Sequence, residues 1–166
     1  LTQKILAYEP SISVPLYLRA PGVSATRSAA FVLNNDLAPT IAALAGAQPN
    51  LEPDGRSLLP LLAGTTPASW RKRFLVEFRD PPATNPPFYA EPFRAVRTAP
   101  TEPTLANTIG IFWDYGATEL YFLDNDPYQL DSRNGPAFDI VRNALRAYAE
   151  RLATCAGADC RAIESE

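Results

Sequence analysis

Four short runs of apolar and β-branched residues follow one another in the second half of the chain, at residues 74–78, 93–97, 108–113 and 119–123. Runs of this length and composition are typical of β-strands. Their succession predicts a small four-stranded antiparallel sheet, and this pattern constrains the fold more than any other feature of the sequence. Residues 80–88, between the first two runs, contain four prolines and are expected to form an extended loop.

A helical pattern follows the four runs and extends from Pro136 to about Ala153. Its apolar residues recur at steps of three and four, at Phe138, Val141, Leu145, Tyr148 and Leu152. This spacing predicts an amphipathic helix. We expect its apolar face to pack on the predicted sheet.

The first 64 residues have a different pattern. They predict a strand at 12–18, interrupted by Pro15, a helix at 37–45 and a short helix at 57–63. A segment this short cannot form its own core, so we expect it to belong to a larger α/β sheet that lies mostly outside this chain. The predicted organisation is therefore an edge of an α/β domain at residues 1–72 and an α+β subdomain at residues 73–166.

The chain of 166 residues contains no histidine and no methionine. The lack of histidine excludes Ser-His-Asp and Cys-His catalysis and every His-ligated metal site within this chain. Because Leu1 is not a translation start, we expect the chain to be processed, trimmed or part of a longer protein.

The charge balance argues against nucleic acid as a partner. Lysine and arginine number 15 and aspartate and glutamate 18, which gives a net charge of -3. Phosphate binding requires a clustered basic face. The densest basic run, residues 71–73, is expected to lie on a solvated edge. No apolar run reaches the roughly 18 residues that a membrane span requires.

The two cysteines, Cys155 and Cys160, lie near the C-terminus and are separated by four residues. This spacing suits a small disulfide-closed loop after the last helix, which would indicate an extracytoplasmic compartment. The alternative is two free thiols. A zinc site is not expected, because two thiolates without a second Cys or His pair cannot complete a tetrahedral shell.

Several short motifs, in order along the chain, resemble the sulfatase family. The sequence Lys4-Ile-Leu-Ala-Tyr8-Glu9 is followed by Val-Pro at 14–15 and Pro-Gly at 21–22. Further similar segments follow in the family's order, at 36–40, 54–61, 70–71, 93–98, 119–121 and 126–128. The segment from Cys155 to Arg161 is similar to the end of some N-acetylglucosamine-6-sulfatase-like members.

The resemblance implies a fold and an activity. The fold would be an alkaline-phosphatase-like α/β catalytic domain, incomplete here, followed by an α+β C-terminal subdomain with a small antiparallel sheet and a packed helix. The activity would be hydrolysis of sulfate esters by a formylglycine, made from Cys or Ser in a Cys/Ser-x-Pro-x-Arg motif, with a divalent cation, typically calcium. Neither cysteine here has that context. Formylglycine and calcium are thus expected outside this chain, which would hold no metal and be inactive alone.

The resemblance also nominates site residues. In relatives the lysine that corresponds to Lys4 points its ammonium at the sulfate, whereas the alternative is a surface lysine at a frayed end. Tyr8 and Glu9 are weaker candidates, which could hold the lysine segment by hydrogen bonds or merely pack. Asp124-Asn-Asp126 is interpreted as a turn rather than a metal site.

Two arginines of the strand predicted at 93–97 are further candidates. We place Arg94 and Arg97 on one face of that strand. They could meet the rim of an anionic substrate, but a pair of structural salt bridges is the favoured interpretation.

The sequence therefore predicts the C-terminal part of an extracytoplasmic sulfatase that acts on a sulfated small molecule or sugar. Two alternatives stay open: a phosphoester or phosphonate hydrolase of the same superfamily, and a non-catalytic module that binds glycans. We expect residues 73–166 to pack on an N-terminal catalytic domain outside this chain, and the isolated chain to be capable of self-association.

Overall fold

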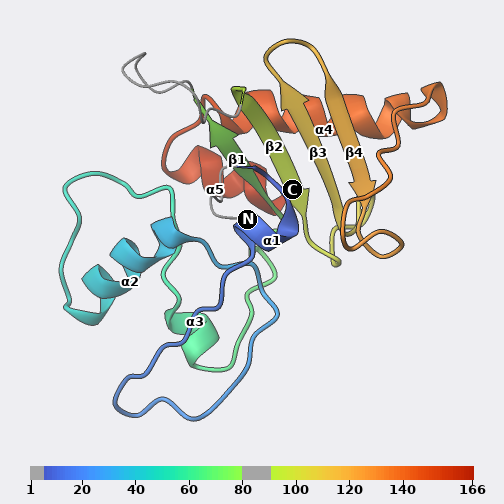
Figure 1. Ribbon diagram of the computed structural model, residues 1–166. Helices are drawn as coiled ribbons and strands as arrows, with labels where there is room; N and C mark the ends of the chain where they lie inside the picture. Colours follow the sequence, from blue (N-terminus) through green and yellow to red (C-terminus); the bar gives the residue numbers. More distant parts are fainter. Residues whose placement is uncertain (1–5, 80–90) are drawn as a thin grey trace, which may run out of the picture. The chain divides into compact units, whose positions relative to one another are not determined.

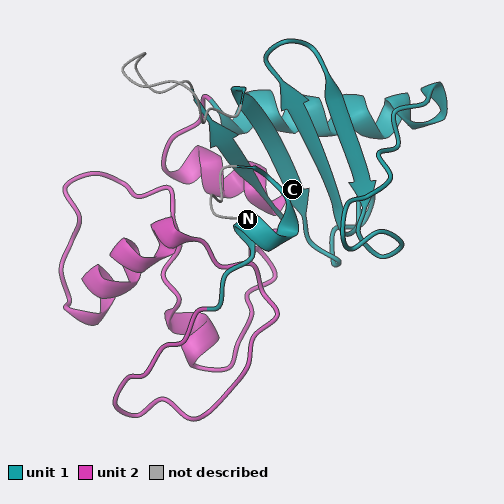
Figure 2. Cartoon of the chain, in the orientation of Figure 1, with its two compact units in different colours: residues 1–15, 73–153 teal, residues 16–72, 154–166 magenta. Residues whose placement is uncertain are grey.

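The computed structural model describes residues 6–79 and 91–166. Lys4 and the proline-rich loop predicted at 80–88 lie outside the described residues. The chain forms two compact units (Figure 2), one from residues 1–15 and 73–153 and the other from residues 16–72 and 154–166. The predicted boundary after residue 72 concerns a larger protein and stays a prediction.

The first unit is built on a four-stranded antiparallel sheet (Figure 1). Its strands, in spatial as in chain order, are β1 (Arg73–Phe78), β2 (Phe93–Thr98), β3 (Thr108–Trp113) and β4 (Thr118–Phe122). The predicted sheet is confirmed, with each strand within a residue or two of its expected bounds. Short runs of this kind are reliable signals, because turn residues separate them clearly.

One face of the sheet is covered by α4 (Asp139–Leu152), which follows the 3-10 turn η2 (Pro136–Phe138) (Figure 1). Leu145 of α4 is fully buried, and a Cβ built at Gly110 of β3 would lie 3.0 Å from its Cδ1 atom. A glycine at this position therefore lets the helix approach the sheet closely. The predicted amphipathic helix is confirmed.

The opposite face of the sheet carries a second apolar layer. Its buried members come from three strands, from Ala7 and from Leu123 just after β4. The segment around α1 (Glu9–Ile12) packs against this layer through Tyr8 and Ile12. The sheet is thus covered on both sides, as a stable α+β unit requires.

The strand predicted at residues 12–18 is wrong. Residues 13–20 have no regular secondary structure, and Tyr17 is 90% exposed. The other large apolar residues of this stretch are also exposed: Val14, Leu16 and Leu18. An apolar run becomes a strand only where a neighbouring strand accepts its backbone hydrogen bonds, and the sheet described here ends at β1 and β4.

The second unit is mostly irregular and contains short helices. These are η1 (Asn34–Asp36), α2 (Leu37–Leu44), α3 (Leu59–Leu62) and α5 (Ala158–Ser165). The helices predicted at 37–45 and 57–63 are confirmed as α2 and α3. The sequence did not predict α5: it predicts only a disulfide-closed loop between Cys155 and Cys160, and α5 begins inside that loop.

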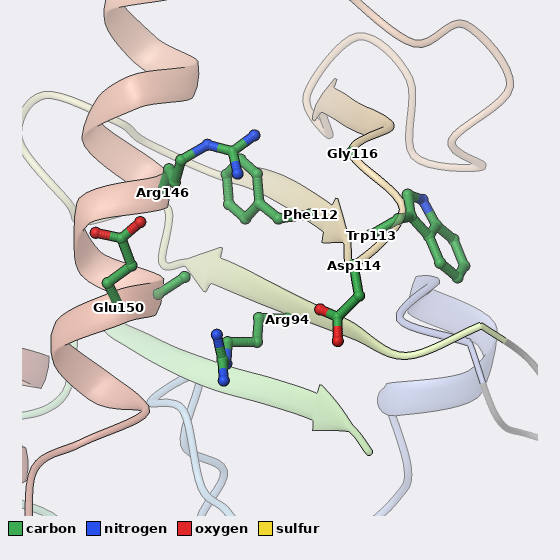
Figure 3. A pocket seen from close by; sticks show the side chains of 8 residues that line it. Arg94, Phe112, Trp113, Asp114, Gly116, Arg146 and Glu150 are labelled. Atoms are coloured by element: carbon green, nitrogen blue, oxygen red, sulfur yellow. The ribbon is translucent and has the colours of Figure 1, made fainter. Parts of the chain in front are cut away.

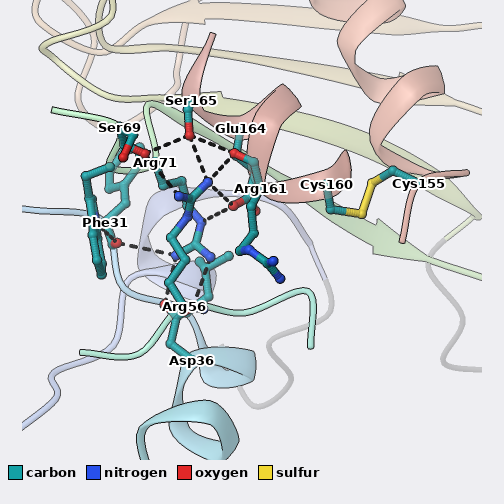
Figure 4. A network of polar contacts seen from close by, with 12 residues as sticks. Phe31, Asp36, Arg56, Ser69, Arg71, Cys155, Cys160, Arg161, Glu164 and Ser165 are labelled. Carbon is teal, nitrogen blue, oxygen red and sulfur yellow. Dashed lines mark hydrogen bonds and ion pairs between the residues drawn. A yellow bond between two sulfur atoms is a disulfide. The ribbon is translucent and has the colours of Figure 1, made fainter. Parts of the chain in front are cut away.

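Arg71, predicted to lie on a solvated edge, is instead buried within the second unit (Figure 4). Its guanidinium donates to both carboxylate oxygens of Asp36, at 2.8 and 3.0 Å, and its Nε atom lies 2.8 Å from Glu164. Asp36 also accepts hydrogen bonds from the backbone amides of Leu33 and Arg56. The prediction failed because these partners lie 35 and 93 residues away in the sequence.

This network sets the ionisation of Asp36. Burial alone would raise the pKa of Asp36, but the hydrogen bonds from Arg71 and from two backbone amides outweigh it and lower the pKa. Arg73 is also buried, in the first unit, where it forms an ion pair with Glu102 at 3.1 Å. Two of the three residues of the basic run therefore serve as internal ion-pair partners.

Cys155 and Cys160 form a disulfide with a Cα–Cα distance of 5.1 Å (Figure 4). The bond joins the segment after α4 to α5. Arg161 of α5 donates to the carbonyl of Pro53 and forms an ion pair with Glu52. The disulfide and these contacts hold α5 within the second unit.

Candidate anchor site for the N-terminal segment

The candidate site lies on the face of the sheet that the N-terminal segment covers. The strand register places Arg97 of β2 in one row with Ile109 and Tyr121, and Glu119 of β4 in the adjacent row on the same face. Two oppositely charged side chains therefore lie on an otherwise apolar face. Arg97 is buried and Glu119 is half-buried, and charges in such surroundings require partners. Each of them finds one in residues 8 and 9.

Glu119 accepts three hydrogen bonds. The Tyr8 hydroxyl donates to its Oε2 atom at 2.9 Å, the Tyr121 hydroxyl donates to the same atom at 2.6 Å, and Trp113 Nε1 donates to its Oε1 atom at 2.8 Å. Three donors on one carboxylate form a strong, charge-assisted set of contacts. They hold the Tyr8 side chain against the sheet.

The same arrangement opposes ionisation of the tyrosines. Burial, followed by the hydrogen bond to Glu119 and the negative charge of that carboxylate, raises the pKa of Tyr8 from 10.0 to about 12. The pKa of Tyr121 is raised for the same reasons. Both hydroxyls are therefore protonated donors at neutral pH.

Glu9 is held by two further contacts. Its carboxylate lies 2.7 Å from Arg97 Nε, and its backbone amide donates to Gln129 Oε1 at 2.6 Å. Arg97 also donates to Asn107 Oδ1 at 2.8 Å, and Asn107 in turn donates to Asp124 at 2.5 Å. Tyr8 and Glu9 are thus fixed by side chains from β2, β4 and the turn after β4.

The structure brings together two of the three residues nominated from the sequence. Tyr8 and Glu9 are adjacent on the sheet face, whereas Lys4 lies outside the described residues. We call Glu119, Arg97 and Gln129 the anchor, because these three side chains hold residues 8 and 9. The sulfate-binding role of Lys4 stays a prediction.

Arg94 and Arg97 do not share a face, contrary to the sequence interpretation. Residues three apart in a strand point to opposite sides, and the register pairs Arg94 with Glu77 and Phe112 on the α4 side. The favoured salt bridges are present: Arg97 pairs with Glu9, and Arg94 lies 3.7 Å from Glu77.

Arg94 lines a separate hollow of about 230 Å³ on the α4 side of the sheet (Figure 3). Arg146 lies over the Phe112 ring, 4.6 Å from its centroid, and Asp114 and Glu150 add carboxylates to the lining. Two arginines and two carboxylates leave this hollow without a charge preference. It lies on the face opposite to the anchor.

The turn interpretation of the Asp124–Asp126 stretch is supported by its hydrogen bonds. The Asp126 carboxylate accepts from the amides of Leu130 and Asp131, at 3.0 and 2.9 Å. Among the described residues, no group of three or more His, Cys, Asp or Glu side chains could hold a metal ion. Within the same residues, no helix is long and apolar enough to cross a membrane.

A family model described as "N-sulphoglucosamine sulphohydrolase, C-terminal" matches residues 1–153. The chain belongs to this sulfatase family. The resemblance inferred from the ordered motifs is thereby confirmed. The match includes the N-terminal segment, the whole sheet and α4, so the anchor lies entirely within the N-sulphoglucosamine sulphohydrolase C-terminal region.

One curated relative is the N-acetylglucosamine-6-sulfatase of Homo sapiens, which is 45% identical over 74 residues. The alignment covers 43% of this chain and 13% of the human protein. The chain therefore spans only a small part of the length of the curated sulfatases that it matches.

Solved structures share the fold. A protein solved in complex with its substrate D-glucosamine-2-N,6-O-disulfate superposes with a TM-score of 0.58 and 24% identity, over 79% of this chain and 25% of that chain. The phosphonate monoester hydrolase of Agrobacterium radiobacter superposes with a TM-score of 0.52 and 25% identity, over 72% of this chain and 23% of that chain. The predicted sulfatase-type fold with its four-stranded sheet is confirmed.

Sequence reasoning missed all three residues of the anchor as partners of the N-terminal segment. Glu119 belongs to the predicted strand 119–123 and alternates onto the same face as Tyr121, so an acidic residue on an apolar face was the available signal. Arg97 was nominated, but without its partner Glu9. Gln129 carried no signal, because its contact joins residues 120 positions apart.

Proposed function

We propose that this chain is the C-terminal part of a sulfatase that hydrolyses sulfate esters, with residues 1–72 contributing an edge of its catalytic domain. The match of the sulfatase family model over residues 1–153 carries this proposal. The anchor supports it, because Tyr8 and Glu9, four and five residues after Lys4, are held on the sheet by one ion pair and two hydrogen bonds.

In the proposed reaction, Lys4 is the residue of this chain that acts on the sulfate. Its ammonium is directed at the sulfate oxygens, where a compact cation stabilises the negative charge that grows as the ester bond breaks. In the proposed enzyme, a formylglycine would supply the nucleophile and a divalent cation, calcium, would polarise the sulfate. We expect both to come from outside this chain, because neither Cys155 nor Cys160 lies in a Cys-x-Pro-x-Arg motif.

The proposed substrate is a 6-O-sulfated glucosamine derivative. The human relative is an N-acetylglucosamine-6-sulfatase, and one structural neighbour was solved with a 6-O-sulfated glucosamine. A second candidate function is hydrolysis of phosphonate or phosphate esters, because one structural neighbour is a phosphonate monoester hydrolase. A non-catalytic glycan-binding module has no specific observation in its favour.

The disulfide supports an extracytoplasmic location, where such bonds persist. In the proposed enzyme, residues 73–166 pack on the N-terminal catalytic domain.

The test compares the isolated 166-residue chain with the full-length protein on a chromogenic aryl sulfate, in the presence of calcium. We expect the full-length protein to release the phenol and the isolated chain to be inactive. The Lys4→Ala variant of the full-length protein is expected to lose most of its kcat/KM. Activity in the isolated chain would show that the nucleophile is not where we place it, and cleavage of an aryl phosphonate in preference to the sulfate would favour the second candidate.

A further inference from the structure

Gln129 combines three features that a surface turn residue does not need. Its backbone has a φ of 56°, a left-handed conformation that non-glycine residues rarely adopt. Its side chain is buried, with the residue 6% exposed. Its Oε1 atom accepts a hydrogen bond of 2.6 Å from the backbone amide of Glu9. Strained conformations persist where the surroundings determine them, and they cluster at functional sites.

The turn around Asp126 produces this conformation. Gln129 donates its own amide to the Asp126 carbonyl at 3.1 Å, and the Asp126 carboxylate accepts from the amides of Leu130 and Asp131. These bonds close the chain tightly around Gln129. In this turn the Gln129 side chain is buried. Its neighbours Tyr128 and Leu130 are 75% and 84% exposed.

The contact made by Gln129 is to the backbone of the N-terminal segment, not to one of its side chains. A backbone hydrogen bond constrains the path of the chain directly, whereas the contacts of Tyr8 and the Glu9 carboxylate hold the segment through rotatable side chains. Ala7, two residues before Glu9, is 1% exposed and packs in the same apolar layer. Lys4 lies three residues before Ala7 in the sequence.

We propose that Gln129 is a positioning residue of the sulfatase: by holding the Glu9 backbone amide, it sets the path of the N-terminal segment and thereby the placement of Lys4 at the sulfate. This inference rests on the proposed function. It assigns a role to the turn that begins at Asp126. From the sequence alone, this turn has no indicated chemical role.

The amide geometry defines which substitution keeps the contact. Oε1 is the atom that accepts from Glu9, while Nε2 has no hydrogen-bond partner among the described residues. Glutamate has the same length and keeps an oxygen at this position. Asparagine favours the left-handed backbone but is one methylene shorter, so it keeps the turn and loses the reach to Glu9.

The experiment measures kcat/KM of the full-length protein on an aryl sulfate for Gln129→Asn, Gln129→Glu and the exposed neighbour Leu130→Ala. We expect Q129N to lower kcat/KM by about 10- to 100-fold with a melting temperature close to wild type, because small misplacements of a charge-stabilising group are costly. Q129E should keep most of the wild-type kcat/KM, and L130A should have the same kcat/KM as the wild type.

A double-variant cycle separates positioning from stability. If Gln129 acts through Lys4, K4A/Q129N should be no slower than K4A alone, because the lysine is already gone. Additive losses, or a Q129N enzyme as active as the wild type, would overturn the inference while leaving the sulfatase assignment intact. A wild-type protein that hydrolyses no sulfate ester would instead refute the proposed function on which the inference rests.

Discussion

At the scale of single residues, the molecule is organised by charges placed in apolar surroundings. Glu119 lies on an apolar sheet face and is satisfied by three neutral donors, whereas Asp36 is fully buried and is satisfied by an arginine and backbone amides. An unpaired charge in either place would be strongly unfavourable. These residues therefore specify which segments come together.

The first prediction concerns the Tyr8–Glu119 contact. The pKa of Tyr8 is about 12 in the folded protein and near 10.0 when unperturbed. Because the raised pKa keeps the phenol protonated, its contribution to the free energy of unfolding is complete below pH 10 and is lost as the pH rises from about 10 to about 12. Glu119→Gln should lower the pKa of Tyr8, measured by NMR titration of the tyrosine ring carbons.

Glu77→Gln is the control for this titration, because Glu77 lies in β1 on the other side of the sheet, paired with Arg94. It should leave the pKa of Tyr8 near 12. An equal shift in both variants would mean that general charge, and not the contact with Glu119, governs Tyr8.

A second prediction concerns the buried pair of Asp36 and Arg71. Asp36→Asn should lower the free energy of unfolding by about 3 kcal/mol, because it leaves the buried guanidinium of Arg71 short of a charged partner. Urea denaturation measures this loss. Since the pKa of Asp36 is lowered in the folded protein, the wild type should also lose this stabilisation as the pH falls below the ordinary value of 3.8.

Asp131→Asn provides a matched control. Asp131 pairs with Arg133 at 3.0 Å, but both side chains are more than half exposed. An exposed pair is worth less than about 1 kcal/mol. If the two substitutions cost the same, burial is not what makes the Asp36–Arg71 pair important.

At the scale of elements, packing of α4 on the sheet depends on the glycine of β3. Gly110→Ala should destabilise the protein by about 1–3 kcal/mol, because the new methyl group would lie 3.0 Å from Leu145 and 3.1 Å from the Phe112 ring. Thermal unfolding of the purified chain measures this effect.

Gly135→Ala is the matched control, since a Cβ at that position meets no atom within 4 Å. Combining Gly110→Ala with Leu145→Val, which removes a methylene from the crowded helix side chain, should recover part of the loss. Equal melting temperatures for both single glycine variants would mean that α4 does not approach the sheet as described.

The elements also show what sequence could and could not predict. The four strands and α4 were predictable because their apolar periodicity is local. The run at 12–18 was not, because an apolar pattern does not reveal whether a pairing strand is present. The burial of Arg71 depends on Glu164, and the role of Gln129 depends on Glu9, so neither could be deduced from nearby sequence.

At the scale of the whole molecule, the chain is one segment of a sulfatase-type architecture in which the two compact units each draw on distant parts of the sequence. The N-terminal stretch crosses back to the sheet of residues 73–153, where the anchor fixes it. The ordered motifs were enough to predict the family. The partners that fix Tyr8 and Glu9 became known only from the fold.

The most direct test of the sulfatase assignment is release of inorganic sulfate from N-acetylglucosamine 6-sulfate by the full-length protein, measured by ion chromatography. We predict stoichiometric sulfate and free N-acetylglucosamine, with release strongly reduced in the Lys4→Ala variant. Absence of sulfate release from this and from aryl sulfates, together with hydrolysis of a phosphonate ester by the same preparation, would contradict the assignment.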